Sequence, residues 1–270
     1  MEEVFQTLRE QQKSVFSHHG ISVVNVATEE EGNSLALQLL QEIINKQTVL
    51  YLSGGRTPRS LYTEMAKEEV VVPGAFALVD ERYGEPLHGN SNEKMLYDSG
   101  LIRYATMSNI HVYLALQKGK SREETAEKYD DQVRTLLAQY RKHLAILGVG
   151  MDGHTAGIPS QISKLKSQKS KPDWFEDLQE RSKNRMVIDY DDQGGFYGER
   201  ITMTFQGLSM MDLLIVLVFG KDKKTALELM FSDGSEPIRD PAQGEEEVPS
   251  RFYKRPEISR KTLLITDLMF

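Results

Sequence analysis

The chain has 270 residues, 39% of them hydrophobic and 27% charged, which is enough apolar material for one α/β domain or two small ones. Its 33 Lys and Arg against 40 Asp and Glu give a formal net charge of −7, which argues against nucleic acid as a partner and leaves room for a small basic pocket. The absence of cysteine excludes disulfides, thiolate metal sites and a cysteine nucleophile.

The N-terminal segment, "MEEVFQTLREQQKSVF", is charged and amphipathic. It lacks the apolar stretch that follows basic residues in a signal peptide, and no later segment reaches the length of a membrane span. We therefore expect a cytoplasmic protein without a membrane partner.

Short apolar segments of strand length alternate with longer helical patterns along the chain. The predicted strands are 21–27, 48–53, 74–83, 109–116, 143–150, 186–191, 200–205, 212–220 and 262–268. Two of the intervening helices begin at capping boxes, one formed by Thr28 and Glu31 and the other by Ser121 and Glu124. This alternation indicates an α/β fold with a mainly parallel sheet covered by helices.

Two segments, 160–195 and 233–250, are expected to be surface insertions or loops. The first begins with the Lys- and Ser-rich "SQISKLKSQKSKPDW", and the second is acidic. Neither has the length of an independent domain, and the chain has no internal repeat or low-complexity linker. We therefore expect residues 1–270 to form a single domain.

The segment 143–157 reads "HLAILGVGMDGHTAG", and its glycines fit the dinucleotide fingerprint G-x-G-x-x-G. That interpretation needs a helix at the third glycine and an acidic residue at a strand end about 20 residues later. Pro159 would interrupt such a helix early, and Asp173 lies in a polar context away from any predicted strand. The pattern therefore disfavours a dinucleotide site.

The alternative is a catalytic loop that presents Asp152 and His154 at the carboxyl end of a parallel strand, where ligands of open α/β sheets bind. A histidine that merely lies in a loop would be the simpler explanation if it stood alone. The aspartate two residues away, and the polar residues at other predicted strand ends, favour a site instead.

Three further strand ends carry polar or charged residues. In "LSGGRTP", Gly54, Gly55 and Thr57 suit a phosphate site at a helix N-terminus, although an ordinary turn explains them equally well. The strand in "LVDERYGEPLHGNSN" runs directly into Asp80, Glu81 and Arg82, and the Arg82 guanidinium suits a phosphate or carboxylate.

Asn90 and Asn92, which follow, fit either a helix cap or a site. In "LIVLVFGKDKK", lysines such as Lys223 lie at a helix start, where the helix dipole disfavours them. A bound anion would explain them, and an exposed basic patch is the alternative. Arg200, just before the segment "ITMTF", is ambiguous in the same way.

Together these motifs resemble those of 6-phosphogluconolactonases in order and approximate spacing, from about residue 21 to the end of the chain. They are "LSGGRTP", "VDERYGEPLHGNSN", "GVGMDGHTAGIP", "RITMTF" and "VFGKDKKTAL". That family shares its fold with glucosamine-6-phosphate deaminases, ribose-5-phosphate isomerases and some sugar-sensing regulators.

The resemblance implies a doubly wound, mostly parallel sheet in one domain. It also implies hydrolysis of 6-phosphoglucono-δ-lactone to 6-phosphogluconate in the oxidative pentose phosphate pathway. No metal or organic cofactor is expected, and the partner would be a small phosphorylated sugar lactone. We expect a monomer or a weak homo-oligomer.

The resemblance also assigns roles to residues. His154 would be the general base on the attacking water, Asp152 would orient it, and Arg82, with Asn92 nearby, would contact the phosphate or stabilise charge at the lactone. The residues expected to hold the phosphate are Gly54, Gly55, Thr57, Lys223 and Arg200.

Several positions depart from the family pattern. After "DGHTA", where a serine and then Leu-Phe-Pro are common, this chain has Gly157, Ile158 and Pro159. Arg56 stands where a small residue is usual and adds a cation beside the phosphate loop. These departures predict a shifted substrate preference or weak activity.

Two other functions fit the same fold. Related deaminases carry a glutamate five residues after the histidine, where this chain has Pro159, and "DEY" where this chain has "DER". A phosphosugar sensor usually brings a helix-turn-helix segment, for which residues 1–20 are too few. A sensor without DNA contacts would not need a base such as His154.

Overall fold

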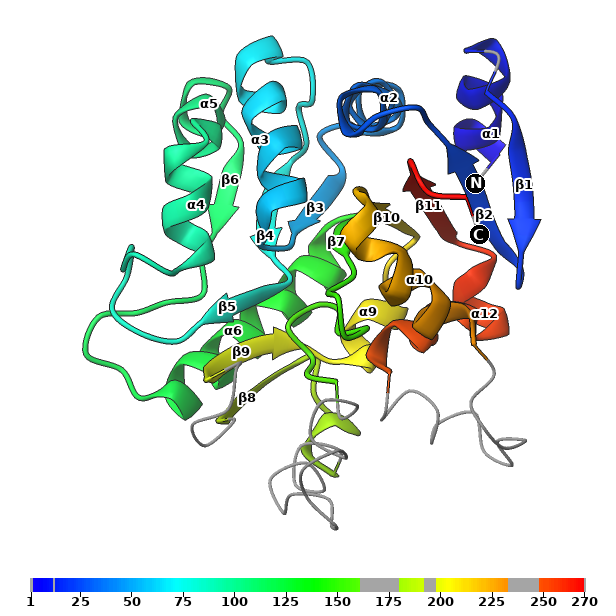
Figure 1. Cartoon of the computed structure of the whole chain (residues 1–270). Coiled ribbons are helices and arrows are strands. Elements are labelled where there is room, and N and C mark those ends of the chain that lie inside the picture. Colours follow the sequence, from blue (N-terminus) through cyan, green and yellow to red (C-terminus); the bar gives the residue numbers. More distant parts are fainter. Residues whose placement is uncertain (1, 12, 161–179, 192–197, 233–247, 270) are drawn as a thin grey trace, which may run out of the picture.

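A central sheet of eight strands forms the middle layer of the protein, with helices packed around it (Figure 1). The computed structural model describes residues 2–11, 13–160, 180–191, 198–232 and 248–269. In sheet order the strands are β1 (Val15–His18), β2 (Ile21–Asn25), β11 (Thr262–Thr266), β10 (Leu213–Val218), β7 (Lys142–Gly148), β3 (Thr48–Leu52), β4 (Ala75–Leu78) and β6 (His111–Tyr113). All neighbouring pairs are parallel except β1 and β2, so the predicted mostly parallel sheet is confirmed.

Helices connect most of these strands. The helices of the described part are α1 (Glu2–Glu10), α2 (Glu29–Ile43), α3 (Arg56–Glu68), α4 (Asn92–Asp98), α5 (Leu101–Met107), α6 (Arg122–Gln139), α9 (Phe205–Ser209), α10 (Lys224–Phe231) and α12 (Pro256–Ser259), with 3-10 turns η1 (Lys221–Lys223) and η2 (Pro249–Lys254). Within the same residues, none of these helices combines the length and apolar character that a membrane span requires.

The predicted helix starts at Thr28 and Ser121 are confirmed. The Thr28 side chain accepts a hydrogen bond from the backbone N–H of Glu31, and Ser121 and Glu124 form both hydrogen bonds of a capping box. These contacts satisfy backbone N–H groups that have no partner inside the helix.

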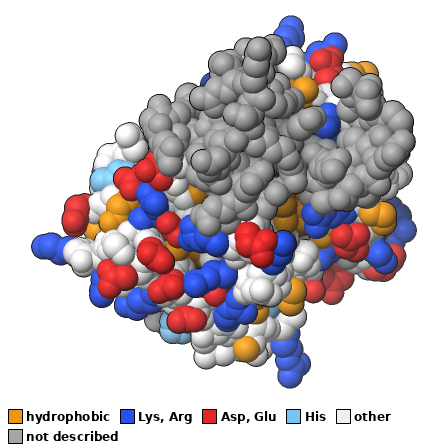
Figure 2. Space-filling model, turned by 90° about the horizontal axis from the view of Figure 1, so that it is seen from below, with side chains coloured by type: hydrophobic (Ala, Val, Ile, Leu, Met, Phe, Trp, Pro, Cys, Tyr) orange, Lys and Arg blue, Asp and Glu red, His pale blue; other side chains and the backbone are white. Residues whose placement is uncertain are grey.

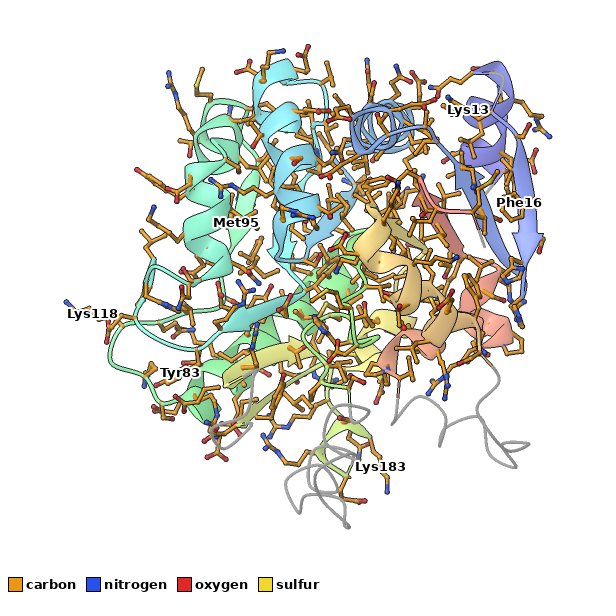
Figure 3. All side chains as sticks on the ribbon, viewed as in Figure 1. Lys13, Phe16, Tyr83, Met95, Lys118 and Lys183 are labelled. Carbon is orange, nitrogen blue, oxygen red and sulfur yellow. The ribbon has the colours of Figure 1, made fainter. Side chains whose placement is uncertain are left out.

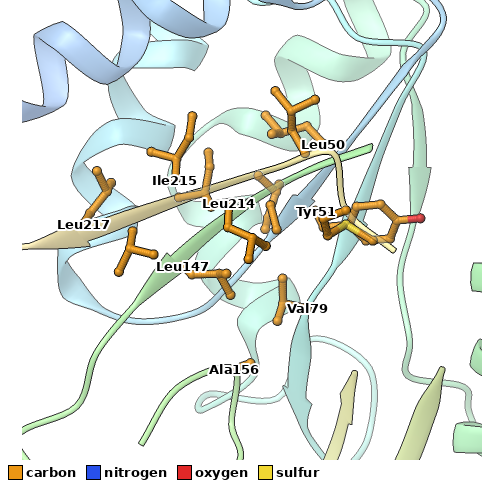
Figure 4. Packing of buried hydrophobic residues seen from close by; sticks show 14 of the residues in the cluster. Leu50, Tyr51, Val79, Leu147, Ala156, Leu214, Ile215 and Leu217 are labelled. Carbon is orange, nitrogen blue, oxygen red and sulfur yellow. The ribbon is translucent and has the colours of Figure 1, made fainter. Parts of the chain in front are cut away.

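The central strands are apolar because both of their faces are covered. Every residue of β3, β4, β10 and β11 is buried. Side chains such as Leu50, Leu147 and Ile215 belong to one cluster that lies between neighbouring elements (Figure 4). This continuous burial explains why the sequence shows runs of apolar residues rather than strict alternation.

The sheet reverses its direction of growth between β3 and β7. After β3 the chain adds β4 and β6 on one side, whereas after β7 it adds β10 and β11 on the other. β3 and β7 are neighbours, and the chain continues from them toward opposite sides of the sheet. The loops at their carboxyl ends therefore diverge and leave a crevice, which is where doubly wound sheets bind ligands.

The predicted strand 74–83 is wrong as a single element. It divides at Val79 into β4 of the central sheet and β5 (Asp80–Arg82), which pairs antiparallel with β9 (Glu199–Met203). β9 also pairs with β8 (Val187–Asp191), so the strands expected at 186–191 and 200–205 belong to a second, three-stranded sheet. Val79 joins the two sheets, because its N–H bonds to the Leu52 carbonyl and its carbonyl accepts from Met203 N–H.

The predicted loops need partial correction. β8 (Val187–Asp191) lies inside the segment 160–195 and is buried in four of its five residues, so this part is not a surface loop. At the end of the segment 233–250, Val248 and Ser250 are fully buried. Residues 161–179, 192–195 and 233–247 lie outside the described residues.

The N-terminal edge of the sheet was not predicted. β1 is a four-residue outer strand, and its Phe16 is 44% exposed (Figure 3).

Seen from below, the described surface intersperses Lys and Arg with Asp and Glu (Figure 2). On that part of the face no extended area of a single charge is visible, which agrees with the modest net charge.

Candidate active site

A cleft of about 660 Å³ lies at the carboxyl ends of β3, β7 and β10 and is also lined by residues of β5 and β9. This volume is in the range of small-molecule sites. The sequence-predicted residues that line it are Gly54, Gly55, Thr57, Arg82, Asp152, His154, Arg200 and Lys223. Asn92 is the predicted site residue that does not line it.

The loop after β7 places Asp152 and His154 side by side. The Nδ1 atom of His154 lies 2.6 Å from Oδ1 of Asp152, which also accepts the backbone N–H of His154 at 3.2 Å. A Cβ on Gly150 would lie 2.0 Å from His154 Nδ1, and Gly153 has a φ of +84°. These glycines therefore accommodate the imidazole ring and the turn, and no helix begins at Gly153 as a dinucleotide site would require.

The contact with Asp152 favours one tautomer of His154. In the neutral imidazole, a carboxylate close to Nδ1 favours the proton on Nδ1, which leaves the basic lone pair on Nε2. The side chains of His154 and Asp152 are 31% and 26% exposed, so both remain accessible from the cleft. The pair has the arrangement of a general base and the residue that orients it.

The segment 248–253 contacts this loop through two hydrogen bonds. Ser250 N–H donates to the Gly153 carbonyl at 2.9 Å, and the Tyr253 hydroxyl lies 2.6 Å from Thr155 Oγ1. Thr155 in turn donates to the Gly148 carbonyl at 2.8 Å, which ties the loop to the end of β7. Because Thr155 follows His154 directly, the Tyr253 hydroxyl restrains the segment that carries the histidine.

Replacing Tyr253 with Phe removes its hydroxyl. For a reaction in which His154 is the base, this change should lower kcat about threefold to tenfold with little change in KM. The free energy of unfolding should fall by about 1 kcal/mol. Tyr104→Phe is the control, because the buried Tyr104 hydroxyl donates to the Val71 carbonyl at 2.8 Å and does not line the cleft. Steady-state kinetics and denaturant unfolding of both variants measure these two effects. A kcat of Tyr253→Phe equal to that of Tyr104→Phe would contradict the positioning role.

The loop after β3 lies at the N-terminus of α3. Gly55, with a φ of +113°, precedes the first helical residue, and no side chain caps the helix there. The first turn of α3 contains no acidic residue. Backbone N–H groups at such a helix start are available to an anion, and the loop that carries Gly54 and Thr57 lies there.

Asn92 supports Arg82 from behind the cleft wall. Its Oδ1 accepts from Arg82 Nη1 at 2.6 Å, and its Nδ2 donates to the Asp80 carbonyl at 2.7 Å. A Cβ on Gly54 would lie 2.0 Å from Asn92 Oδ1, so the glycine makes room for the amide. The structure thus places Asn92 as a support for Arg82, because these contacts occupy both ends of its amide.

Glu81 was noted in the charged cluster but was not predicted to support the site. It is fully buried, and its carboxylate accepts backbone N–H bonds from Arg82, Asn92 and Glu93 at 2.6 to 2.8 Å. Burial raises the pKa of Glu81 to about 8, while the three N–H bonds oppose that shift. Glu81 therefore fixes the start of α4 to β5, and with it the position of Arg82.

Arg200 lies on β9, opposite Arg82 of β5 in the strand register, and pairs with Asp80. Arg200 Nη1 lies 3.5 Å from Asp80 Oδ2, and both side chains are largely buried. Gly157 packs against Asp80, since a Cβ there would lie 2.9 Å from it, and its φ is +70°. The departure from the family at Gly157 therefore lies on the wall of the cleft, where Asp80 occupies the space that a larger residue would need.

Lys223 completes the basic part of the cleft. It ends the 3-10 turn after Gly220, and its Nζ donates to the Val149 carbonyl at 2.9 Å. Burial lowers the pKa of Lys223, and Arg56 lowers it further, whereas Asp222 and Asp152 raise it. The ammonium group is thus partly desolvated beside the Asp152 loop, where an anion would interact with it strongly.

The cleft also contains residues that the sequence did not assign to the site. Asp80, Asp222 and Ser53 line it. Asp80 could have been found from its place beside Arg82 in "DER", but neither Ser53 nor Asp222 carries a comparable signal, because their position depends on the neighbouring strands.

Comparisons with known proteins agree with this geometry. The chain is 29% identical to 6-phosphogluconolactonase from Thermotoga maritima over 197 residues, covering 73% of this chain and 79% of that protein. It is 28% identical to glucosamine-6-phosphate deaminase from Oceanobacillus iheyensis over 216 residues, covering 74% and 80%. The structure of 6-phosphogluconolactonase from Plasmodium vivax superposes with a TM-score of 0.69 at 19% identity, covering 98% of this chain and 94% of that one.

These similarities extend through the segments that form the cleft. Residues 27–251 match the family described as "Glucosamine-6-phosphate isomerases/6-phosphogluconolactonase". The matched range includes the loops after β3, β7 and β10, together with β5 and β9. The chain belongs to this family of glucosamine-6-phosphate isomerases and 6-phosphogluconolactonases.

Proposed function

We propose that the protein hydrolyses 6-phosphoglucono-δ-lactone to 6-phosphogluconate, the lactone-opening step of the oxidative pentose phosphate pathway. The observation that carries this proposal is the Asp152–His154 pair, whose Nε2 lone pair lies in the same cleft as several cations. A phosphorylated lactone requires both features, because its phosphate needs positive charge and its carbonyl needs an activated water.

In this proposal the phosphate binds at the start of α3. Backbone N–H groups of the loop 54–57 and the Thr57 hydroxyl would donate to its oxygens, and Lys223 would supply charge. Arg200, held by Asp80, would add a second donor group. The rigid placement of these groups would hold the lactone ring over the β7 loop.

The reaction begins when His154 takes a proton from water on Nε2 while the water oxygen adds to the lactone carbonyl carbon. The carbonyl oxygen gains negative charge, which Arg82 stabilises, since Asn92 and the Asn90 carbonyl fix its guanidinium. The bond from this carbon to the ring oxygen then breaks, and the imidazolium returns the proton to the leaving oxygen. Asp152 stabilises the imidazolium throughout.

The related deaminase reaction is the second candidate, since a deaminase is among the relatives. Pro159, at the position of that group's catalytic glutamate, is a buried residue without an acid-base group.

The experiment offers the purified chain freshly prepared 6-phosphoglucono-δ-lactone and, separately, glucosamine 6-phosphate. We expect acid release from the lactone above its spontaneous rate and no ammonia from the amino sugar; ammonia release alone would refute the lactonase proposal. Binding of both compounds without turnover would indicate a sensor.

We further propose that the protein acts in the cytoplasm as a monomer or weak homo-oligomer, without nucleic acid or membrane as partner. The net charge of −7 supports the absence of a nucleic-acid partner.

A further inference from the structure

Arg56 is a cleft residue to which the mechanism above gives no role. It is the first residue of α3, a helix of 13 residues, and follows Gly55 directly. A cation at the start of a helix is unfavourable, because the helix dipole places positive charge there already. The exposed residue lines the cleft together with the glycine loop.

Arg56 has no carboxylate partner among the residues that the structure describes. Other cleft cations are held by protein groups: Arg200 by Asp80, and Arg82 by Asn92. The charge of Arg56 instead acts on Lys223, another cation, and contributes to lowering the pKa of that lysine. Two cations that repel each other across one cleft are stabilised when a multiply charged anion lies between them.

Ser53 provides a second, independent sign of a ligand at this place. The residue is 4% exposed and lines the cleft, yet its buried Oγ has no hydrogen-bond partner in the described structure. The Ser53 carbonyl is anchored, because the buried Tyr62 hydroxyl donates to it at 2.9 Å. A buried hydroxyl without a partner costs free energy, and a bound oxyanion would supply the missing acceptor.

We propose that Arg56 is a specificity-determining residue that binds the substrate phosphate together with Lys223 and the Ser53 hydroxyl. This inference rests on the proposed function and deepens it. The planar guanidinium presents paired N–H donors that match two phosphate oxygens. The enzyme therefore favours a dianionic phosphate ester over a neutral lactone by more than its glycine loop and Lys223 alone provide.

The test compares Arg56→Ser and Arg56→Lys with Arg59→Ser. Arg59 is the matched control, since it is an exposed arginine on the same helix and does not line the cleft. For Arg56→Ser we expect KM for the phosphorylated lactone to rise about tenfold, with kcat changed less than about twofold. The rate of hydrolysis of unphosphorylated glucono-δ-lactone should stay unchanged. Arg56→Lys should have an intermediate KM, because it keeps the charge but lacks the paired N–H donors of the guanidinium.

A binding measurement separates this inference from the proposed function. Titration calorimetry with inorganic phosphate should give a Kd about tenfold weaker for Arg56→Ser than for the wild type or Arg59→Ser. If the wild type hydrolyses the lactone but Arg56→Ser binds phosphate equally well, the inference is overturned and the proposed function stands. If the wild type lacks lactonase activity but Arg56→Ser binds phosphate more weakly, the proposed function fails and the phosphate role of Arg56 stands. Wild-type protein that binds no phosphate overturns the inference.

Discussion

Replacing His154 with Ala should lower kcat for hydrolysis of 6-phosphoglucono-δ-lactone by about 10²- to 10⁴-fold, which is the usual contribution of a general base. KM should change little, because in the proposed binding mode the phosphate is held by the loop 54–57 and Lys223 rather than by His154. The measurement is the steady-state rate after subtraction of the protein-free rate, since the lactone also opens without catalyst.

His111→Ala is the control for this variant. His111 is exposed on β6, far along the sheet from β7, and it does not line the cleft. It should keep wild-type kinetics, and both variants should unfold like the wild type. A His154→Ala variant that is folded and retains most of the wild-type kcat would remove this residue from the mechanism.

Replacing Asp152 with Asn should lower kcat by about 10²-fold or more, even though the side chain keeps its shape. Asp152 accepts the Nδ1 proton of His154 over 2.6 Å. An amide in its place donates to Nδ1 when its NH₂ group faces the ring, which moves the proton to Nε2 and removes the basic lone pair. The loss should therefore appear in kcat, with circular dichroism spectra unchanged.

Asp131→Asn serves as its control, because Asp131 is exposed on α6 and its side chain takes no part in the cleft. It should match the wild type in both kinetic constants. If Asp152→Asn also matched the wild type, the imidazole would not depend on this carboxylate for its tautomer.

The sequence predicted the cleft because its main parts are local in the chain. Tandem glycines before a helix, and Asp152 and His154 between glycines, each carry their geometry within a few residues. A mostly parallel sheet then brings the ends of β3, β7 and β10 together without further information. For this reason the predicted residues of these three loops all line one cleft.

Other features depend on pairings that no short segment encodes. The run 74–83 looks like one strand, yet Val79 bonds to both sheets and the chain changes partners there. Asn92 fits a cap or a ligand by its pattern, yet it is neither, because Ser91 caps α4 and the amide of Asn92 packs against Gly54 and holds Arg82. The bracing of Thr155 by Tyr253 joins residues 98 positions apart and has no local signal.

In the proposed reaction, this cleft opens a phosphorylated lactone with His154 as the base. Its most direct test is the rate of acid release from freshly generated 6-phosphoglucono-δ-lactone, measured for the wild type, for His154→Ala and for buffer alone at the same pH and temperature. We expect a wild-type rate far above that of buffer and a His154→Ala rate close to that of buffer. A wild-type rate equal to that of buffer, or equal rates for the two proteins, would contradict it.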